Sequence, residues 1–173
     1  MVLASGRGER FVASGGSGSK LLALLAGKPV LQWTLDAVRA SGLLWHLEDA
    51  GHEGMGDSIA AGVRATRGAG GWLILPGDLP LVRPASLRRV AAALAGHGVV
   101  LPTYQGVQGH PVAFAADCVD ALLELSGAQG AAQVVRTQRE ANRVLQLELD
   151  DPGLVTDIDS LHDLARAEQL LSR

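Results

Sequence analysis

The chain has 173 residues, of which 47% are hydrophobic and 19% charged, a composition typical of one globular domain spanning residues 1–173. A net charge of −3 and 3% aromatic residues offer neither the basic surface nor the stacking platforms that nucleic-acid binding needs. The single cysteine, Cys118, excludes an intramolecular disulfide framework, and the lack of an 18-residue apolar run or a signal-like start predicts a cytoplasmic protein without a membrane partner.

The first half of the chain predicts alternating short elements. Residues 1–4 are apolar and are expected to form the first strand, after which the sequence turns glycine-rich. A helical period of apolar residues predicts a helix that begins at Pro29 and stops at Gly42. Residues 44–47 are expected to form a short strand, and Ser58 is predicted to be the N-cap of a small helix.

The second half continues the alternation. The apolar run 72–75 predicts a strand buried on both faces. Further strands are expected at 99–101, 111–114 and 145–149. Helices are expected to begin at Pro84 and to cover 119–123 and 131–137. Ser160 and Asp163 resemble a capping box that opens a last helix, whose Leu164, Ala167 and Leu171 are expected to point inward. Strands that alternate with helices predict an α/β fold with a mainly parallel sheet flanked by helices.

A glycine-rich, basic segment follows the first predicted strand, from Leu3 to Phe11 and on to Lys20. Glycines let backbone N–H groups approach phosphate oxygens, and Arg10 and Lys20 can neutralise the phosphate charge. The segment matches neither the P-loop nor the dinucleotide fingerprint, which needs a glycine where Phe11 stands. It predicts a phosphate site or, alternatively, a solvated basic loop.

A carboxylate follows the central predicted strand. Asp78 stands between Pro76 and Pro80, where it can hold Mg²⁺ that bridges substrate phosphates. The alternative is that Asp78 only stabilises a turn. Together with the basic glycine-rich segment, it supplies what phosphoryl or nucleotidyl transfer needs, because positioning and charge neutralisation provide most of that catalysis.

Six motifs follow one another over nearly the whole chain. They are Leu3-Ala4-Ser5-Gly6 with Arg10 and Lys20, Gly54-Met55-Gly56-Asp57-Ser58, Leu75-Pro76-Gly77-Asp78-Leu79-Pro80, Gly109-His110-Pro111-Val112, Gly127-Ala128-Gln129-Gly130-Ala131 and Thr156-Asp157-Ile158-Asp159-Ser160. In this order they resemble the MobA-like NTP transferases. The Gly-His-Pro element is similar to the molybdenum cofactor cytidylyltransferase branch, so the resemblance favours CTP over GTP.

This resemblance implies a Rossmann-like nucleotidyltransferase fold, Mg²⁺ as cofactor, and transfer of a nucleotide to molybdopterin cofactor with release of pyrophosphate. It implies catalytic roles for Arg10, Lys20 and Asp78, with Asp78 on the metal and Asp159 as a second candidate ligand. The implied nucleotide site comprises Leu3, Ala4, Ser5, Gly6, Gly8, Arg10, Lys20, Ser58, Pro76 and Asp78, and the implied acceptor site comprises Gly109 and His110. A molybdoenzyme or its chaperone is an implied recipient of the product.

Other interpretations of the same residues stay open. His110 could pack a turn, and Asp157 and Asp159 could cap the last helix. The region between Leu43 and Gly54 is shorter than usual in the family, and Ala128 replaces an acidic residue. These departures allow a non-catalytic nucleotide- or pterin-binding accessory protein, or a transferase that uses another phosphorylated acceptor.

Overall fold

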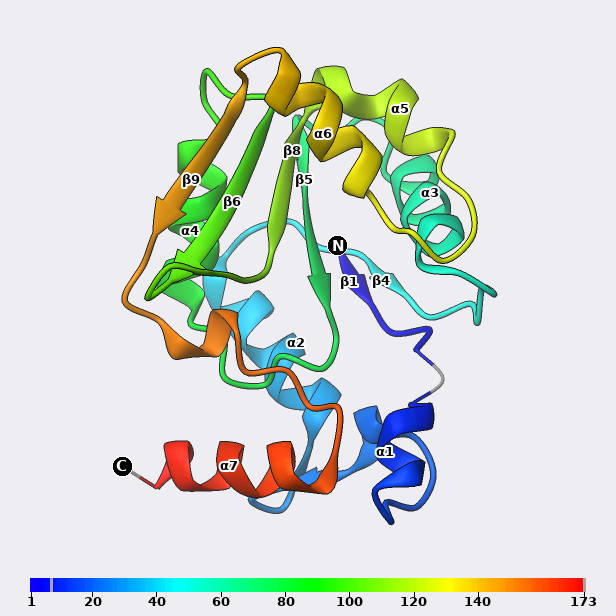
Figure 1. The fold of residues 1–173 in the computed structure, drawn as a ribbon, viewed down its shortest axis with the longest axis vertical. Coiled ribbons are helices and arrows are strands. Elements are labelled where there is room, and N and C mark those ends of the chain that lie inside the picture. The colour runs from blue at the N-terminus through cyan, green and yellow to red at the C-terminus, as the bar shows by residue number, and fades with distance from the viewer. Residues whose placement is uncertain (7, 173) are drawn as a thin grey trace.

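A seven-stranded sheet forms the centre of the computed structural model, which describes residues 1–6 and 8–172 (Figure 1). Arg7, a basic residue of the glycine-rich segment, lies outside the described residues. The strand order is β4-β1-β5-β8-β6, and β7 and β9 both pair with β6. The strands are β1 (Val2–Leu3), β4 (Leu47–Glu48), β5 (Gly71–Pro76), β6 (Val99–Tyr104), β7 (Val107–Gln108), β8 (Val112–Ala115) and β9 (Val144–Glu148).

Most strands of the sheet run in one direction. β1 is parallel to both β4 and β5, and β6 is parallel to β9. β8 runs antiparallel to both β5 and β6, which places those two strands in the same direction. The predicted α/β fold with a mainly parallel sheet is therefore confirmed, with β8 and β7 as the reversed strands. The carboxyl ends of five strands meet at one edge, called here the carboxyl edge.

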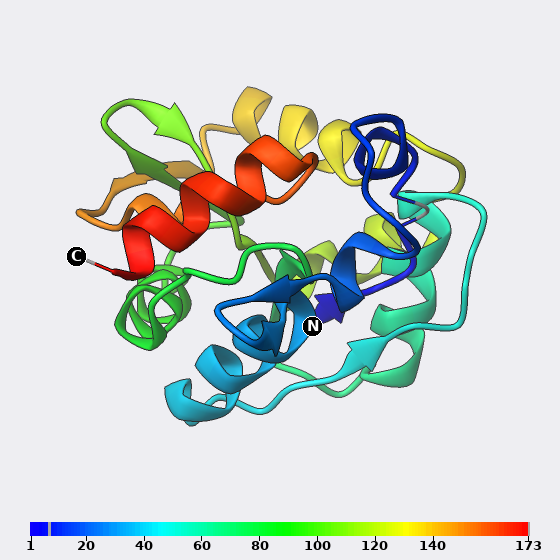
Figure 2. The same ribbon diagram turned by 90° about the horizontal axis from the view of Figure 1, so that it is seen from below.

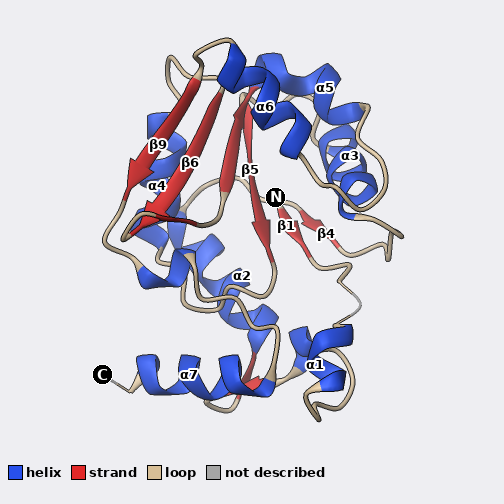
Figure 3. Ribbon diagram, viewed as in Figure 1, coloured by secondary structure: helices blue, strands red, loops and turns tan. Residues whose placement is uncertain are grey.

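Helices cover both faces of the sheet (Figure 3). Apolar contacts place α2 (Val30–Ser41) and α4 (Pro84–Ala93) on one face, and α3 (Met55–Ala65), α5 (Val119–Leu123) and α6 (Ala132–Glu140) on the other. An apolar core lies on each face of the sheet, and β5 contributes side chains to both. Trp72 and Ile74 pack toward α3, while Leu75 packs toward α2. No helix in the described residues is long and apolar enough to span a lipid bilayer.

A third layer lies across the carboxyl edge. It contains α1 (Glu9–Ala13), a small hairpin of β2 (Leu24–Leu25) and β3 (Lys28–Pro29), and α7 (Leu161–Leu171). Figure 2, seen from below, shows α1 and α7 lying in front of the sheet. The small apolar core of this third layer is formed by Phe11, Leu25, Val30, Ile158 and Ala167. Segments from both ends of the chain therefore enclose the carboxyl edge.

Several boundaries agree with the sequence. α2 follows Pro29 directly and ends at Gly42, whose φ of 73° is the left-handed conformation that glycine adopts easily. α4 begins at Pro84, and β5 contains the predicted run 72–75. These predictions succeed because proline, glycine and continuous apolar runs act locally.

Three predictions need correction. Ser58 is not an N-cap: α3 begins at Met55, and Ser58 lies in its first turns with its hydroxyl donating to the Gly54 carbonyl over 3.2 Å. The strand predicted at 44–47 is displaced to Leu47–Glu48, where it pairs with β1. Leu171, predicted to point inward, is 37% exposed, because α7 buries only a narrow stripe at Ala167.

Candidate active site

Two neighbouring strands bring two predicted motifs to one place. β1 and β5 are parallel, and Leu3 is in register with Pro76. The Gly77 N–H donates to the Leu3 carbonyl over 2.8 Å, so the glycine-rich segment and the Asp78 turn leave the sheet side by side. A ligand that contacts one of these segments therefore lies close to the other.

The turn that carries Asp78 is held on several sides. Thr34 Oγ1 on α2 donates to the Gly77 carbonyl over 2.9 Å, and the Ile158 N–H donates to the Asp78 carbonyl over 3.0 Å. A Cβ at Gly77 would lie only 3.1 Å from the Leu3 carbonyl oxygen, so this residue leaves little room for a side chain. The Asp78 carboxylate consequently stands on a fixed backbone. Nothing local in the sequence points to the role of Thr34.

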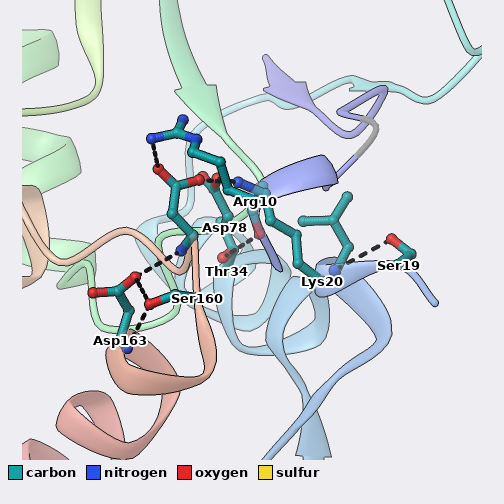
Figure 4. Close-up of polar contacts among 10 residues, drawn as sticks. Arg10, Ser19, Lys20, Thr34, Asp78, Ser160 and Asp163 are labelled. Carbon is teal, nitrogen blue, oxygen red and sulfur yellow. Dashed lines mark hydrogen bonds and ion pairs between the residues drawn. The ribbon is translucent and has the colours of Figure 1, made fainter. Parts of the chain in front are cut away.

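Four charged side chains meet at this turn (Figure 4). Lys20 Nζ lies 2.6 Å from Asp78 Oδ2 and 2.6 Å from Asp159 Oδ1. The Arg10 guanidinium, on a largely exposed side chain, lies 2.7 Å from Asp159 Oδ2. A cavity of about 270 Å³ beside the cluster is lined by Gly8, Glu9, Arg10, Phe11, Lys20 and Asp159. The cluster therefore opens toward the glycine-rich segment.

The charges of the cluster determine its chemistry. Burial disfavours the ammonium of Lys20, but Asp78 and Asp159 outweigh this effect and raise the pKa of Lys20. Burial raises the pKa of Asp157, and the like charges of Asp159 and Asp78 raise it further. Burial lowers the pKa of His110, so its imidazole is neutral at pH 7. Three carboxylates thus face two basic side chains, and a polyanionic ligand needs additional positive charge to bind.

Three buried polar atoms at the carboxyl edge have no hydrogen-bond partner among residues 1–6 and 8–172: Ser5 Oγ, Asp78 Oδ1 and His110 Nδ1. Ser5 follows β1 and Asp78 follows β5, while His110 precedes the reversed strand β8 and so reaches the same edge. Buried polar atoms without partners are uncommon in folded proteins, and three of them at one edge are what a site for a polar ligand or an ion would show. The carboxyl edge is therefore the candidate binding site.

The unpaired oxygen of Asp78 also tests whether the residues at the carboxyl edge fit a divalent metal ion. Asp78 Oδ1 is a hard oxygen ligand without a partner, and Asp159 supplies a second carboxylate nearby. Among the described residues, no three His, Cys, Asp or Glu side chains gather so that they could hold a metal ion by themselves. Mg²⁺ is commonly bound through one or two carboxylates together with substrate phosphates, so the two aspartates fit it.

Asp159 owes its position to the start of α7. Ser160 is the N-cap of this helix, since its Oγ accepts from the Asp163 N–H over 3.3 Å. Asp163 Oδ2 in turn accepts from the Asp159 N–H over 3.2 Å. The capping interaction predicted for Ser160 and Asp163 is confirmed, whereas Asp159 does not cap the helix with its side chain. Its carboxylate points to Lys20 and Arg10 instead.

The Gly109-His110 pair is fixed by its backbone. The Gly109 N–H donates to the Pro102 carbonyl over 2.8 Å, and the His110 N–H donates to the Leu154 carbonyl over 2.9 Å. A Cβ at Gly109 would lie 2.3 Å from the Leu154 carbonyl oxygen, so glycine is required for this close approach. The packing fixes the His110 ring near Asp78, whose charge contributes to the pKa of this imidazole.

The predicted site residues divide into those that gather and those that do not. Arg10, Lys20, Asp78 and Asp159 form one cluster, and Gly8 packs against the Lys20 stem. Leu3 and Ala4 use backbone groups within the sheet, with the Ala4 N–H donating to the Glu48 carbonyl over 2.8 Å. Ser58 is buried, and its hydroxyl is engaged within α3.

The N-terminus of α3 is hydrogen-bonded to the loop of the Gly-Ala-Gln-Gly-Ala motif. The Gly56 N–H donates to the Gly127 carbonyl over 2.8 Å, and Asp57 Oδ2 accepts from the Gly127 N–H over 3.0 Å. Gly54 lies so close that a Cβ there would be 2.2 Å from the Gly127 carbonyl oxygen. Two motifs far apart in the sequence thus form one structural unit.

We expect Gly54→Ala to destabilise the protein by about 1–3 kcal/mol, because the new methyl group cannot fit without a backbone shift. The backbone at Gly54 is extended, so alanine adds no conformational strain of its own. Gly68→Ala is the matched control, since a Cβ there meets nothing within 4 Å. Thermal unfolding of both variants tests the prediction, and equal stabilities would contradict it.

A parallel-strand edge with a glycine-rich segment, two basic side chains and a pair of carboxylates has the parts that an α/β enzyme of phosphoryl or nucleotidyl transfer needs. Residues 37–144 match the MobA-like NTP transferase domain. The chain belongs to this family, as the order of its motifs predicts. The matched range includes Asp78 and the Gly-His-Pro element.

Two solved structures share the fold over nearly the full length of the chain, and one curated protein matches part of its sequence. A nucleotidyl transferase from Methanothermobacter thermautotroptrophicus has a TM-score of 0.82 at 25% identity, covering 99% of this chain and 97% of that chain. Molybdopterin-guanine dinucleotide biosynthesis protein A from Archaeoglobus fulgidus has a TM-score of 0.66 at 20% identity, covering 99% and 97%. The bifunctional protein GlmU of Trichlorobacter lovleyi is 30% identical in an alignment of 125 residues that covers 58% of this chain and 26% of that protein. The match therefore spans about a quarter of that curated relative.

Proposed function

We propose that this protein is a Mg²⁺-dependent nucleotidyltransferase that transfers CMP from CTP to the terminal phosphate of molybdopterin cofactor and releases pyrophosphate. The observation that carries the proposal is the cluster of Lys20, Asp78 and Asp159 at the carboxyl edge, with Asp78 Oδ1 unpartnered. Membership of the MobA-like family supports the reaction class. The Gly109-His110-Pro111 element supports the cytidylyl branch.

The reaction is a displacement at the α-phosphorus of the nucleotide. An acceptor phosphate oxygen forms a bond to this phosphorus, and the bond to the oxygen that bridges to the β-phosphate breaks. Pyrophosphate leaves with the electron pair. Because the acceptor oxygen is already anionic, the protein needs no strong general base. Its own task is to align the two substrates and to neutralise their charges.

Each residue of the cluster has a role in this scheme. Backbone N–H groups at Gly6 and Gly8 bind the triphosphate, and Arg10 and Lys20 neutralise its charge. Asp78 and Asp159 would hold Mg²⁺, which supplies Lewis-acid stabilisation of the phosphate oxygens when bound. The fixed Asp78 turn keeps one carboxylate in place while the substrates change charge.

The remaining predicted residues are assigned to substrate recognition. We assign Ser5 to the nucleotide side, with the buried Ser58 behind it as a structural support, and Gly109 and His110 to the acceptor side. The neutral imidazole of His110 can donate or accept a hydrogen bond, and its unpartnered Nδ1 supports contact with a polar acceptor group. The pterin of molybdopterin cofactor carries such groups.

Pyrophosphate release tests this function directly. The full chain is incubated with Mg²⁺ and molybdopterin cofactor, and CTP, GTP or ATP is offered separately. We expect release with CTP. Release with GTP alone would retain the reaction and overturn the choice of base. Nucleotide binding without release from any of the three would contradict transfer to this acceptor and favour an accessory protein or another phosphorylated acceptor.

A further inference from the structure

Lys20 lies where a metal ion would be expected. Its ammonium is equidistant, at 2.6 Å, from an oxygen of Asp78 and an oxygen of Asp159 (Figure 4). The three side chains are 12%, 14% and 20% exposed, so water screens these contacts only in part. A single positive charge thus bridges the two carboxylates that would hold Mg²⁺.

The lysine and a metal ion compete for this position. Mg²⁺ binds oxygen at about 2.0–2.1 Å, so an ion shared by both carboxylates would need the space that the ammonium fills. Two cations at such close range also repel each other strongly in a partly buried site. Metal binding to both carboxylates therefore requires that Lys20 move away.

The surroundings of Lys20 indicate where its ammonium can go. The lysine stem lies against Gly8, since a Cβ on Gly8 would be 3.6 Å from Lys20 Cγ. The cavity of about 270 Å³ lies on the same side, between Lys20 and the glycine-rich segment. A triphosphate bound there offers the ammonium new anionic partners. Without the triphosphate, an ammonium that leaves the carboxylates exchanges two ion pairs for water.

We propose that Lys20 is an internal counter-ion that keeps divalent metal from the Asp78–Asp159 pair until a nucleotide binds. The triphosphate of the nucleotide then pairs with the Lys20 ammonium in place of the two carboxylates. This inference rests on the proposed function, because it assumes that the two carboxylates hold the metal and that a triphosphate binds the glycine-rich segment. Its consequence is that metal and nucleotide bind together, each strengthening the other.

Binding of Mn²⁺ to the full chain tests this inference without any turnover. Mn²⁺ prefers the same oxygen ligands as Mg²⁺ and is detected directly by electron paramagnetic resonance. We expect Lys20→Met to bind Mn²⁺ about tenfold more tightly than the wild type in the absence of nucleotide, a factor that corresponds to about 1.4 kcal/mol. Lys28→Met is the matched control, because Lys28 pairs with Asp36 away from the cluster and should leave Mn²⁺ affinity unchanged.

A second variant and a second readout keep the test decisive. Lys20→Gln retains a polar side chain and replaces Lys20→Met if that variant does not fold, as judged by thermal unfolding. A non-hydrolysable CTP analogue should tighten Mn²⁺ binding to the wild type, and this gain should shrink in the Lys20 variants. Equal or weaker Mn²⁺ binding by the folded variants would overturn the inference. If the wild type nevertheless releases pyrophosphate, the proposed function stands without it.

Discussion

Replacement of Asp78 by asparagine should lower kcat/KM for pyrophosphate release by about a thousandfold, because it removes a charge aimed at the reacting phosphates. Asparagine has nearly the same shape, and the turn is fixed by Thr34 and Ile158 through backbone groups that the substitution leaves unchanged. The loss is therefore expected without unfolding. Steady-state kinetics with CTP and molybdopterin cofactor measure it.

Asp36→Asn is the matched control for this substitution. Asp36 lies on α2 and pairs with Lys28 at the surface, so the same chemical change should leave the kinetics unaltered. Thermal unfolding of both variants separates catalysis from stability. Unchanged turnover by Asp78→Asn would show that the carboxylate takes no part in the reaction.

Asp151→Ala should destabilise the protein by roughly 3 kcal/mol, because three hydrogen-bond donors, in two fully buried bonds and one partly buried bond, lose their acceptor. Asp151 is 1% exposed. Its Oδ2 accepts from Ser86 Oγ over 2.6 Å and from the Arg83 N–H over 3.0 Å, and its Oδ1 accepts from the Gly153 N–H over 2.9 Å. These contacts join the start of α4 to the segment that leads to the active site.

The expected loss corresponds to a decrease in melting temperature of roughly 10 °C. Differential scanning calorimetry measures it, and Asp150→Ala is the control, because the Asp150 side chain is exposed and only its carbonyl contacts Arg83. A melting temperature of Asp151→Ala equal to that of the control would refute a structural role for this carboxylate.

Local signals account for the elements that the sequence predicts well. α2 and α4 are delimited by Pro29, Gly42 and Pro84, and β5 is a continuous apolar run. The short helix α1 is not predicted, since glycines surround it and Phe11 is its one buried residue. The start of α3 is also missed, because close packing of Gly54 against Gly127 determines it.

The candidate site is predicted in its parts but not in its assembly. Asp78 stands out because it follows a buried strand between two prolines, and Lys20 because it ends a glycine-rich segment. Their link to Asp159 is not visible in the sequence, since 139 residues separate Lys20 from Asp159. The packing of Ile158 and α7 against α1 and the β2–β3 hairpin, together with the Ile158 N–H bond to the Asp78 carbonyl, brings these two residues together.

The reversed strand β8 also separates the two halves of the proposed reaction along the chain. In the proposed reaction, residues that follow β1 and β5 bind the nucleotide, whereas His110 reaches the same edge from a strand that runs the other way. The turn between β6 and β7 can therefore vary in length or sequence while the Asp78 turn keeps its register. This arrangement allows the acceptor side of the proposed site to differ in shape while the nucleotide side keeps the same backbone.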